Sequence, residues 1–128
     1  MNHTANINHD AVLRARVALL GSEKLPIRQR VAAYRVLAQV SPLAYLPLLS
    51  AALYKYGTRE FRDQPGIELA LRAESVDAAR RAYALEAERA PLLLIALEHY
   101  GEQLALLGRA EELRAVEDEL ARMGRKAR

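Results

Sequence analysis

Apolar residues recur along most of this chain at helical spacing, and a glycine or proline interrupts them at short intervals. Spacings of three and four place residues on one face of an α-helix, whereas a half-buried strand needs strict alternation. Alanine and leucine supply most of the apolar residues, and glutamate and arginine most of the charges; all four residue types favour helix. Residues that suit a pleated sheet are scarce. We therefore expect an all-α fold.

Glycine, proline and capping residues divide the chain into six main helices and one short helix. Asp10 is the predicted N-cap of the first helix, and Gly21 its stop. Pro42 follows a serine and marks a helix start, Ser75 is a predicted N-cap, and Gly108 is a predicted helix break. The second helix opens at Ser22 or at the Leu25-Pro26 pair and ends near residue 40. The other expected helices cover approximately residues 10–20, 42–57, 67–71, 76–89, 91–107 and 109–123.

Pro47 should kink the third helix or reset its start, because its ring removes one backbone hydrogen bond. Residues 58–65 have no clean apolar period and are predicted to form a loop, while the other turns are very short, which favours antiparallel neighbours. At 128 residues the chain suffices for one domain with a single modest core. We expect a helical domain over residues 10–124, a flexible N-terminus over 1–9 and a basic stub over 125–128.

The chain has no cysteine, which removes disulfides, thiolate metal sites and thiol nucleophiles together. The first residues are polar and lack the apolar stretch of a secretory signal. The longest apolar run, residues 92–97, is far shorter than the roughly 20 residues of a membrane span. Arginine outnumbers lysine, as is typical of a GC-rich genome. We expect a bacterial, cytoplasmic protein without membrane insertion.

The last third of the chain carries the most specific pattern. Tyr83 follows Ala79 by four residues and precedes Pro91 by eight. A Leu-x₂-Tyr-Gly-x₂-Leu string then covers residues 97–104. This pattern resembles the tetratricopeptide repeat (TPR), a 34-residue unit of two antiparallel helices that ends on a proline. In such a unit, Gly101 would allow close approach of the paired helix.

The TPR resemblance implies a short solenoid of stacked helix hairpins. Pro42 and Pro91 lie 49 residues apart, so a 34-residue unit requires an insertion of about 15 residues, which residues 58–73 would hold. The alternative is a compact, irregular helical bundle in which glycine and proline only mark the helix ends.

The resemblance also implies a concave groove that binds a partner protein. A groove with one apolar and one acidic wall would suit an amphipathic helix or an extended peptide. For the third helix, ordinary core is the more common reading of the same positions, and it needs no ligand. The expected groove residues are Leu46, Leu49, Leu53, Tyr56, Ile95, Glu98 and Glu102.

A second candidate surface is a line of basic residues. Lys24, Arg28 and Arg35 share one face of the second helix, and Arg14 and Arg16 add to it from the first. No acidic residue is expected to share that face, so it would suit an acidic partner or phosphates. The patch is small and the second half of the chain is acidic, which argues against nucleic acid and favours a solvated face.

The candidate catalytic residues lack the partner side chains that a catalytic or metal site needs. His99 has no second histidine at i+4, and His3 and His9 fall in the expected flexible terminus. The chain has no phosphate loop, nucleotide fingerprint or nucleophile elbow. We therefore expect no enzyme, metal or cofactor.

The leading hypothesis for function is an adaptor or chaperone-like scaffold that binds a helical or extended segment of another protein. The alternative is a nucleic-acid-associated regulator that uses the basic face of the first helix hairpin. Because a short repeat array leaves its end faces uncovered, self-association, such as a homodimer, is also expected.

Overall fold

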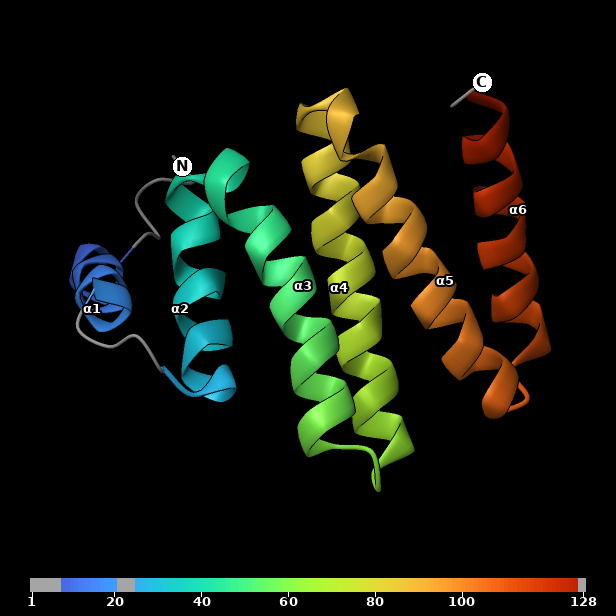
Figure 1. The fold of residues 1–128 in the computed structure, drawn as a ribbon, viewed down its shortest axis with the longest axis horizontal. Coiled ribbons are helices and arrows are strands. Elements are labelled where there is room, and N and C mark those ends of the chain that lie inside the picture. The colour runs from blue at the N-terminus through green and yellow to red at the C-terminus, as the bar shows by residue number, and fades with distance from the viewer. Residues whose placement is uncertain (1–7, 21–24, 127–128) are drawn as a thin grey trace.

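A computed structural model describes residues 8–20 and 25–126, with the backbone alone for 125 and 126. Six α-helices follow one another in a row (Figure 1), no described residue lies in a strand, and the all-α expectation is confirmed. The helices are α1 (His9–Leu20), α2 (Ile27–Val40), α3 (Pro42–Glu60), α4 (Pro65–Leu85), α5 (Ala90–Leu106) and α6 (Ala110–Lys126). A short 3-10 helix (Ala87–Arg89) precedes α5. Most of the expected flexible N-terminus, residues 1–7, lies outside the described residues.

Each described helix packs mainly against its neighbours in sequence. From α2 to α6 the helices alternate in direction along the row, and α1 is seen along its axis at one end (Figure 1). Beyond sequence neighbours, the contact that stands out among the described helices is between α3 and α5. These two helices therefore share one side of the row, with α4 between and behind them.

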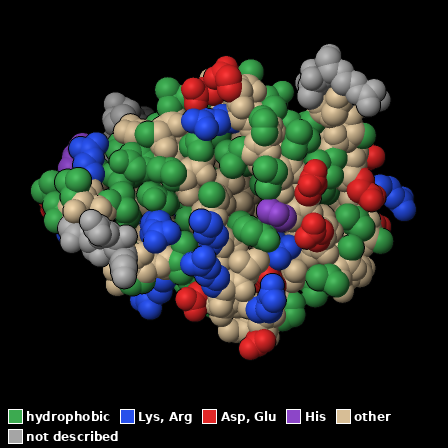
Figure 2. All heavy atoms as spheres, in the orientation of Figure 1, with side chains coloured by type: hydrophobic (Ala, Val, Ile, Leu, Met, Phe, Trp, Pro, Cys, Tyr) green, Lys and Arg blue, Asp and Glu red, His purple; other side chains and the backbone are tan. Residues whose placement is uncertain are grey.

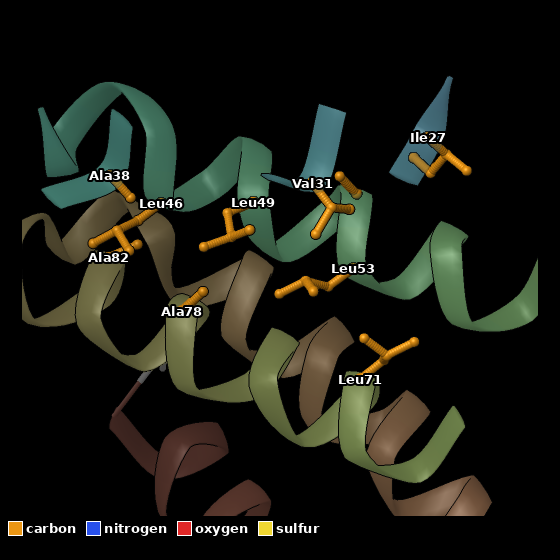
Figure 3. Packing of buried hydrophobic residues seen from close by; sticks show 10 residues of the cluster. Ile27, Val31, Ala38, Leu46, Leu49, Leu53, Leu71, Ala78 and Ala82 are labelled. Atoms are coloured by element: carbon orange, nitrogen blue, oxygen red, sulfur yellow. The ribbon is translucent and has the colours of Figure 1, made fainter. Parts of the chain in front are cut away.

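The hydrophobic interior is a series of clusters rather than the single core expected from chain length. One cluster lies between α2, α3 and α4 (Figure 3), a second between α4, α5 and α6, and a smaller third between α1 and α2. Helix α4 serves two of them: Leu71 and Ala78 belong to the first, and Val76 and Ala79 to the second. Helices in a row share no common centre, so each set of neighbours builds its own core.

Two predicted helix boundaries are confirmed. Pro42 begins α3 after a single linking residue. Gly108 ends α5 with φ of 70°, a conformation that glycine adopts without steric cost. The Arg109 N–H then donates to the carbonyl of Leu104, and the helix closes in a Schellman turn.

Three other predicted boundaries are corrected. Asn8 rather than Asp10 caps α1, because the Asn8 Oδ1 accepts from the Ala11 N–H at 3.1 Å. Helix α3 passes through Pro47 without a new start, and α6 continues through Gly124 to Lys126. Part of the expected C-terminal stub is therefore helical.

Residues 58–73 contain no inserted loop of the kind that a 34-residue repeat would require. Helix α3 continues to Glu60 and α4 begins at Pro65, so the connection is only residues 61–64. The predicted short helix and the helix predicted to follow Ser75 are one helix, and Ser75 lies inside it. Its buried hydroxyl donates to the Ser50 carbonyl of α3 at 2.7 Å, so it joins two helices instead of capping one.

Helices α3 and α5 carry an internal sequence repeat that is longer than the TPR unit. Residues 49–57 and 93–101 share the string Leu-x₂-Ala-Leu-x₂-Tyr-Gly, 44 positions apart. The leucines, alanine and glycine of each string are buried, and the tyrosine is half-buried. Helices α3 and α5 therefore present equivalent faces to their neighbours.

Candidate functional site

The apolar stripe of α3 lies in the core. Leu46 and Leu53 are fully buried and Leu49 nearly so, and their side chains point between α2 and α4 (Figure 3). Tyr56 is half-buried against the same cluster, edge-on to Phe61 at 5.1 Å. These positions do not line an open groove, which corrects the expectation that they face a partner.

A groove does exist, on another face of α3. It runs between α3 and α5, over a stripe of α4 residues spaced three or four apart. The floor residues are Pro65, Glu68, Arg72 and Ser75. We call this feature the α3/α5 groove. It contains two hollows placed end to end.

The upper hollow has a volume of about 230 Å³ and is mainly apolar. Its walls include Ala51 and Tyr54 of α3 and Leu92, Ile95 and His99 of α5. Beneath it the Ser50 hydroxyl donates to the Ser75 carbonyl at 2.9 Å, the reverse of the bond from Ser75 described above. Two small side chains bonded in both directions hold α3 and α4 together at this level.

Aromatic rings bridge the groove between the two hollows. The Tyr54 and His99 rings stack with centroids 3.8 Å apart and planes 15° apart. The Arg72 guanidinium lies 5.3 Å from the centre of the Tyr54 ring, and its Nη1 donates to the His99 carbonyl at 2.6 Å. Arg72 therefore ties the floor to both walls.

The lower hollow has a volume of about 400 Å³ and a polar floor. There the Arg72 Nη2 donates to the Glu68 Oε2 at 3.1 Å, and both side chains are more than nine-tenths buried. Gln103 and Leu106 of α5 and Arg62 complete the walls. A buried charge is tolerated only when it is paired, so Glu68 neutralises Arg72 within the floor.

His99 has an altered acidity. Burial lowers the pKa of His99 below its usual value of 6.5. The carboxylates of Glu102 and Glu98 act in the opposite direction, while the charge of Arg72 lowers the pKa further. The net effect of burial and of these three charges favours the neutral imidazole.

The two helices that flank the groove carry exposed charges of opposite sign, and we call these charges its basic and acidic rims. Lys55 and Arg59 are exposed on α3, and Arg62 is exposed just beyond its end; Glu98 and Glu102 are exposed on α5. Figure 2 shows basic side chains over α2 and α3 and acidic ones over α5. Within the described part of the chain, none of these five side chains makes an ion pair. Of the predicted groove residues on α5, Ile95 lines the upper hollow, whereas the sequence did not single out Lys55, Arg59 or Arg62.

The predicted basic face is smaller than expected. Arg14, Arg16 and Arg28 are exposed, and Lys24 lies outside the described residues. Arg35 is held by Glu74 of α4, with Nη2–Oε1 at 2.7 Å and Nε–Oε2 at 2.8 Å. The expectation that no acid shares this face is therefore corrected, because a carboxylate reaches it from another helix.

A second bidentate pair repeats this arrangement. Arg80 of α4 bonds Glu119 of α6 with Nη2–Oε1 at 2.7 Å and Nε–Oε2 at 3.0 Å. The partners in each pair are 39 residues apart in sequence, and the Arg80 guanidinium lowers the pKa of Glu119 below 4.5. We call the two pairs Arg–Glu clasps. Each joins two even-numbered helices, α2 with α4 and α4 with α6.

The described residues contain no cluster of three or more histidine or acidic side chains placed to hold a metal ion. None of the described helices is both long and apolar enough to cross a membrane. The chain matches no protein-family model, no curated protein and no solved structure. Over residues 8–20 and 25–126 the fold defines a class: an all-α protein of six sequentially packed helices.

Proposed function

We propose that this chain is a helical-repeat interaction module, an adaptor or chaperone-like scaffold that holds a segment of another protein in the α3/α5 groove. The upper hollow is the observation that carries the proposal. Its apolar walls open to the surface, and Ile95 is 53% exposed although it lies in the middle of α5. An exposed apolar patch rimmed by charges is typical of interaction sites.

The construction of the groove supports the same proposal. Helices rather than loops supply its floor and most of its walls, and the Ser50–Ser75 and Arg72–His99 hydrogen bonds fix those helices together. A site held in its binding shape loses less entropy when a partner docks. The proposal rests on this groove and does not require the 34-residue TPR unit, since the internal interval is 44 positions.

Site-specific photocrosslinking would test the proposal. A photoreactive phenylalanine analogue replaces Ala51 in the upper hollow or, as a control, Leu85 at the end of α4. Ala51 and Leu85 are both exposed, so the analogue should disturb the core little at either position. Leu85 is also as exposed as Ile95, at 53%, which makes it the matched control for the Ile95 variant described next. In cells of the source organism we expect position 51, and not position 85, to form an adduct with another protein.

A matched pair of variants then links the adduct to the groove. Ile95→Glu places a charge in the apolar hollow and should reduce crosslinking at least about tenfold, the equivalent of 1.4 kcal/mol. Leu85→Glu should leave it unchanged, and both variants should keep the wild-type melting temperature. Equal crosslinking from positions 51 and 85, or indifference to Ile95→Glu, would refute the proposal. Leu49→Glu is no substitute, because Leu49 belongs to the core.

A further inference from the structure

We propose that the occupant of the α3/α5 groove is an amphipathic α-helix of a partner protein, acidic along one flank and basic along the other. This inference rests on the proposed function and adds the chemistry of the partner. Three features carry it: the unpaired charges of the rims, the apolar upper hollow, and the ring stack between the hollows.

The rim charges call for a partner with complementary flanks. Lys55 and Arg59 would face acidic side chains, and Glu98 and Glu102 would face basic ones. A partner with a single sign of charge would meet one attractive and one repulsive rim, and like charges brought together at an interface are costly. A partner with split charges satisfies both rims at once.

The position of the rims favours a helix over a strand. A helix that turns an apolar stripe toward the groove projects its two flanks sideways, toward both rims. A strand with its apolar side chains turned down would direct all the others upward, away from the rims. Only the helix can use the floor and both rims together.

The spacing of the rim charges fits the same occupant. Lys55 and Arg59 are four residues apart on α3, and so are Glu98 and Glu102 on α5. Four residues rise about 6 Å along a helix. A helix lying along the groove would carry flank charges at the same interval, so each rim charge would meet one partner charge.

The two hollows define how such a helix would sit. One aliphatic side chain would enter the upper hollow, between Ala51 and Ile95. The Tyr54–His99 stack separates this hollow from the lower one, so an elongated occupant that passes over the stack fits better than a compact molecule. Over the lower hollow, whose floor holds the Arg72–Glu68 pair, the helix would place a polar side chain.

A second copy of the chain fits less well. Two identical faces that meet about a twofold axis along the groove would place groove against groove and leave the hollows unfilled. Protein interfaces are packed nearly as densely as protein interiors, and a single helix would act as the ridge that a groove needs. Self-association through this face is therefore an outcome that the test must exclude.

Synthetic peptides provide the test. Three labelled alanine-based helices of about 18 residues, long enough to be helical alone, carry the same leucine stripe. Their flanks are glutamate and lysine, glutamate on both sides, or lysine on both sides. By fluorescence anisotropy we expect the split-charge peptide to bind about tenfold more tightly than either of the others, a difference of 1.4 kcal/mol.

Variants of the full chain assign that preference to the rims. Lys55→Glu with Arg59→Glu turns the α3 rim from basic to predominantly acidic, with Arg62 its one remaining cation, so the lysine-flanked peptide should become the tightest binder. Arg81→Glu with Arg114→Glu changes the net charge equally at exposed sites outside the groove and should keep the original order. Light scattering on the same samples reports self-association.

The outcomes separate this inference from the function on which it rests. Equal binding of all three peptides, or no binding of any, overturns the inference, as does self-association that Ile95→Glu abolishes. In each of these cases, crosslinking of a different protein from position 51 would still uphold the interaction module. Loss of that crosslink refutes the function itself.

Discussion

Arg72 is a buried cation that joins three helices. It pairs with Glu68 on its own helix, donates to the His99 carbonyl on α5, and lies against the Tyr54 ring of α3. Its local sequence does not reveal this role, because an i,i+4 Glu–Arg pair is equally typical of a solvated helix face. The burial of Arg72 depends on α5 packing over it, which is a tertiary fact. The groove floor could therefore not be predicted from spacing.

His99 provides a prediction at this scale. We expect its pKa in the folded protein to lie below 6.5, and Glu102→Gln to lower that pKa further, because the carboxylate favours the imidazolium. A histidine ring-proton titration by NMR measures both values. Glu117→Gln, on an exposed face of α6, should leave His99 unchanged. An upward shift in Glu102→Gln would contradict the electrostatic assignment.

The same lowered pKa links stability to pH. Just below pH 6.5 the unfolded chain binds a proton that folded His99 does not, so stability falls as pH drops from 6.5 through the folded pKa. Above pH 6.5 both forms are neutral and this contribution is constant. The urea midpoint should follow this course in the wild type and change less in His99→Gln. An identical pH dependence in the two proteins would exclude His99 as its source.

At the level of helices, local sequence signals predict where a helix ends better than they predict whether two helical segments form one continuous helix. The helix boundaries predicted at Pro42 and Gly108 are confirmed. The missing N–H of Pro42 and the positive φ of Gly108 constrain the backbone whatever surrounds it. Ser75 misled the prediction, since its hydroxyl serves Ser50 of a neighbouring helix rather than its own backbone. A serine suits an N-cap and a helix contact equally well, so α4 looks like two helices in sequence.

The face of α3 that forms the groove was misassigned for a related reason. Leu46, Leu49 and Leu53 form a proper helical stripe, but Ala51 and Tyr54 form another on the same helix. With apolar residues nearly all round the helix, periodicity cannot tell which stripe meets α4 and which meets solvent. On α5, one candidate stripe carried glutamates; of its residues Ile95, Glu98 and Glu102, Ile95 lines the upper hollow, while the two glutamates are exposed on the same helix.

Two glycines on either side of a helix end give opposite predictions. A Cβ added to Gly101 would lie 3.5 Å from Leu113 Cδ1 and Val116 Cγ1, an ordinary van der Waals contact. Sterics therefore do not require this glycine, contrary to what the TPR resemblance implies. Since alanine favours helix over glycine by about 0.5–1 kcal/mol, Gly101→Ala should raise the free energy of unfolding by that amount.

Gly108→Ala is the matched change at the end of the same helix. Its φ of 70° is unfavourable for alanine, so the free energy of unfolding should fall by about 1–2 kcal/mol. Urea denaturation of both variants measures the two effects. If Gly101→Ala also destabilised the protein, α5 and α6 would have to pack more closely than the structure shows.

The whole molecule is a row of small cores, and its stability should therefore be graded along the row. Helix α1 buries only Val12 and Ala15 and exposes Leu13, Val17 and Leu20. Helices α3 and α4 are packed on both sides. In native-state hydrogen exchange we expect α1 to open at the lowest free energy and α3 and α4 at the highest.

Uniform protection from α1 to α6 would instead show one cooperative unit. The experiment should be repeated after tenfold dilution, because self-association would cover the exposed side of α1 and raise its protection. Protection of α1 that is independent of concentration would assign the gradient to the single chain.

The 44-residue repeat is present in the sequence itself, although a 34-residue template does not detect it. The string Leu-x₂-Ala-Leu-x₂-Tyr-Gly occurs at residues 49–57 and again at 93–101. A 34-residue TPR template cannot align two copies 44 positions apart, so the second copy alone attracted the resemblance. The true interval is set by the long helices α3 and α4, whose lengths a template does not supply.

The Arg–Glu clasps bear on how such a chain can grow. Arg35 and Arg80 are 45 positions apart, and so are Glu74 and Glu119. Helix α4 thus supplies the glutamate of one clasp and the arginine of the other. Tandem duplication of a 45-residue segment would bring a glutamate for the preceding unit and an arginine for the following one. A longer protein with one more repeat unit could therefore arise in a single genetic event, with an Arg–Glu clasp already present on each side of the added unit.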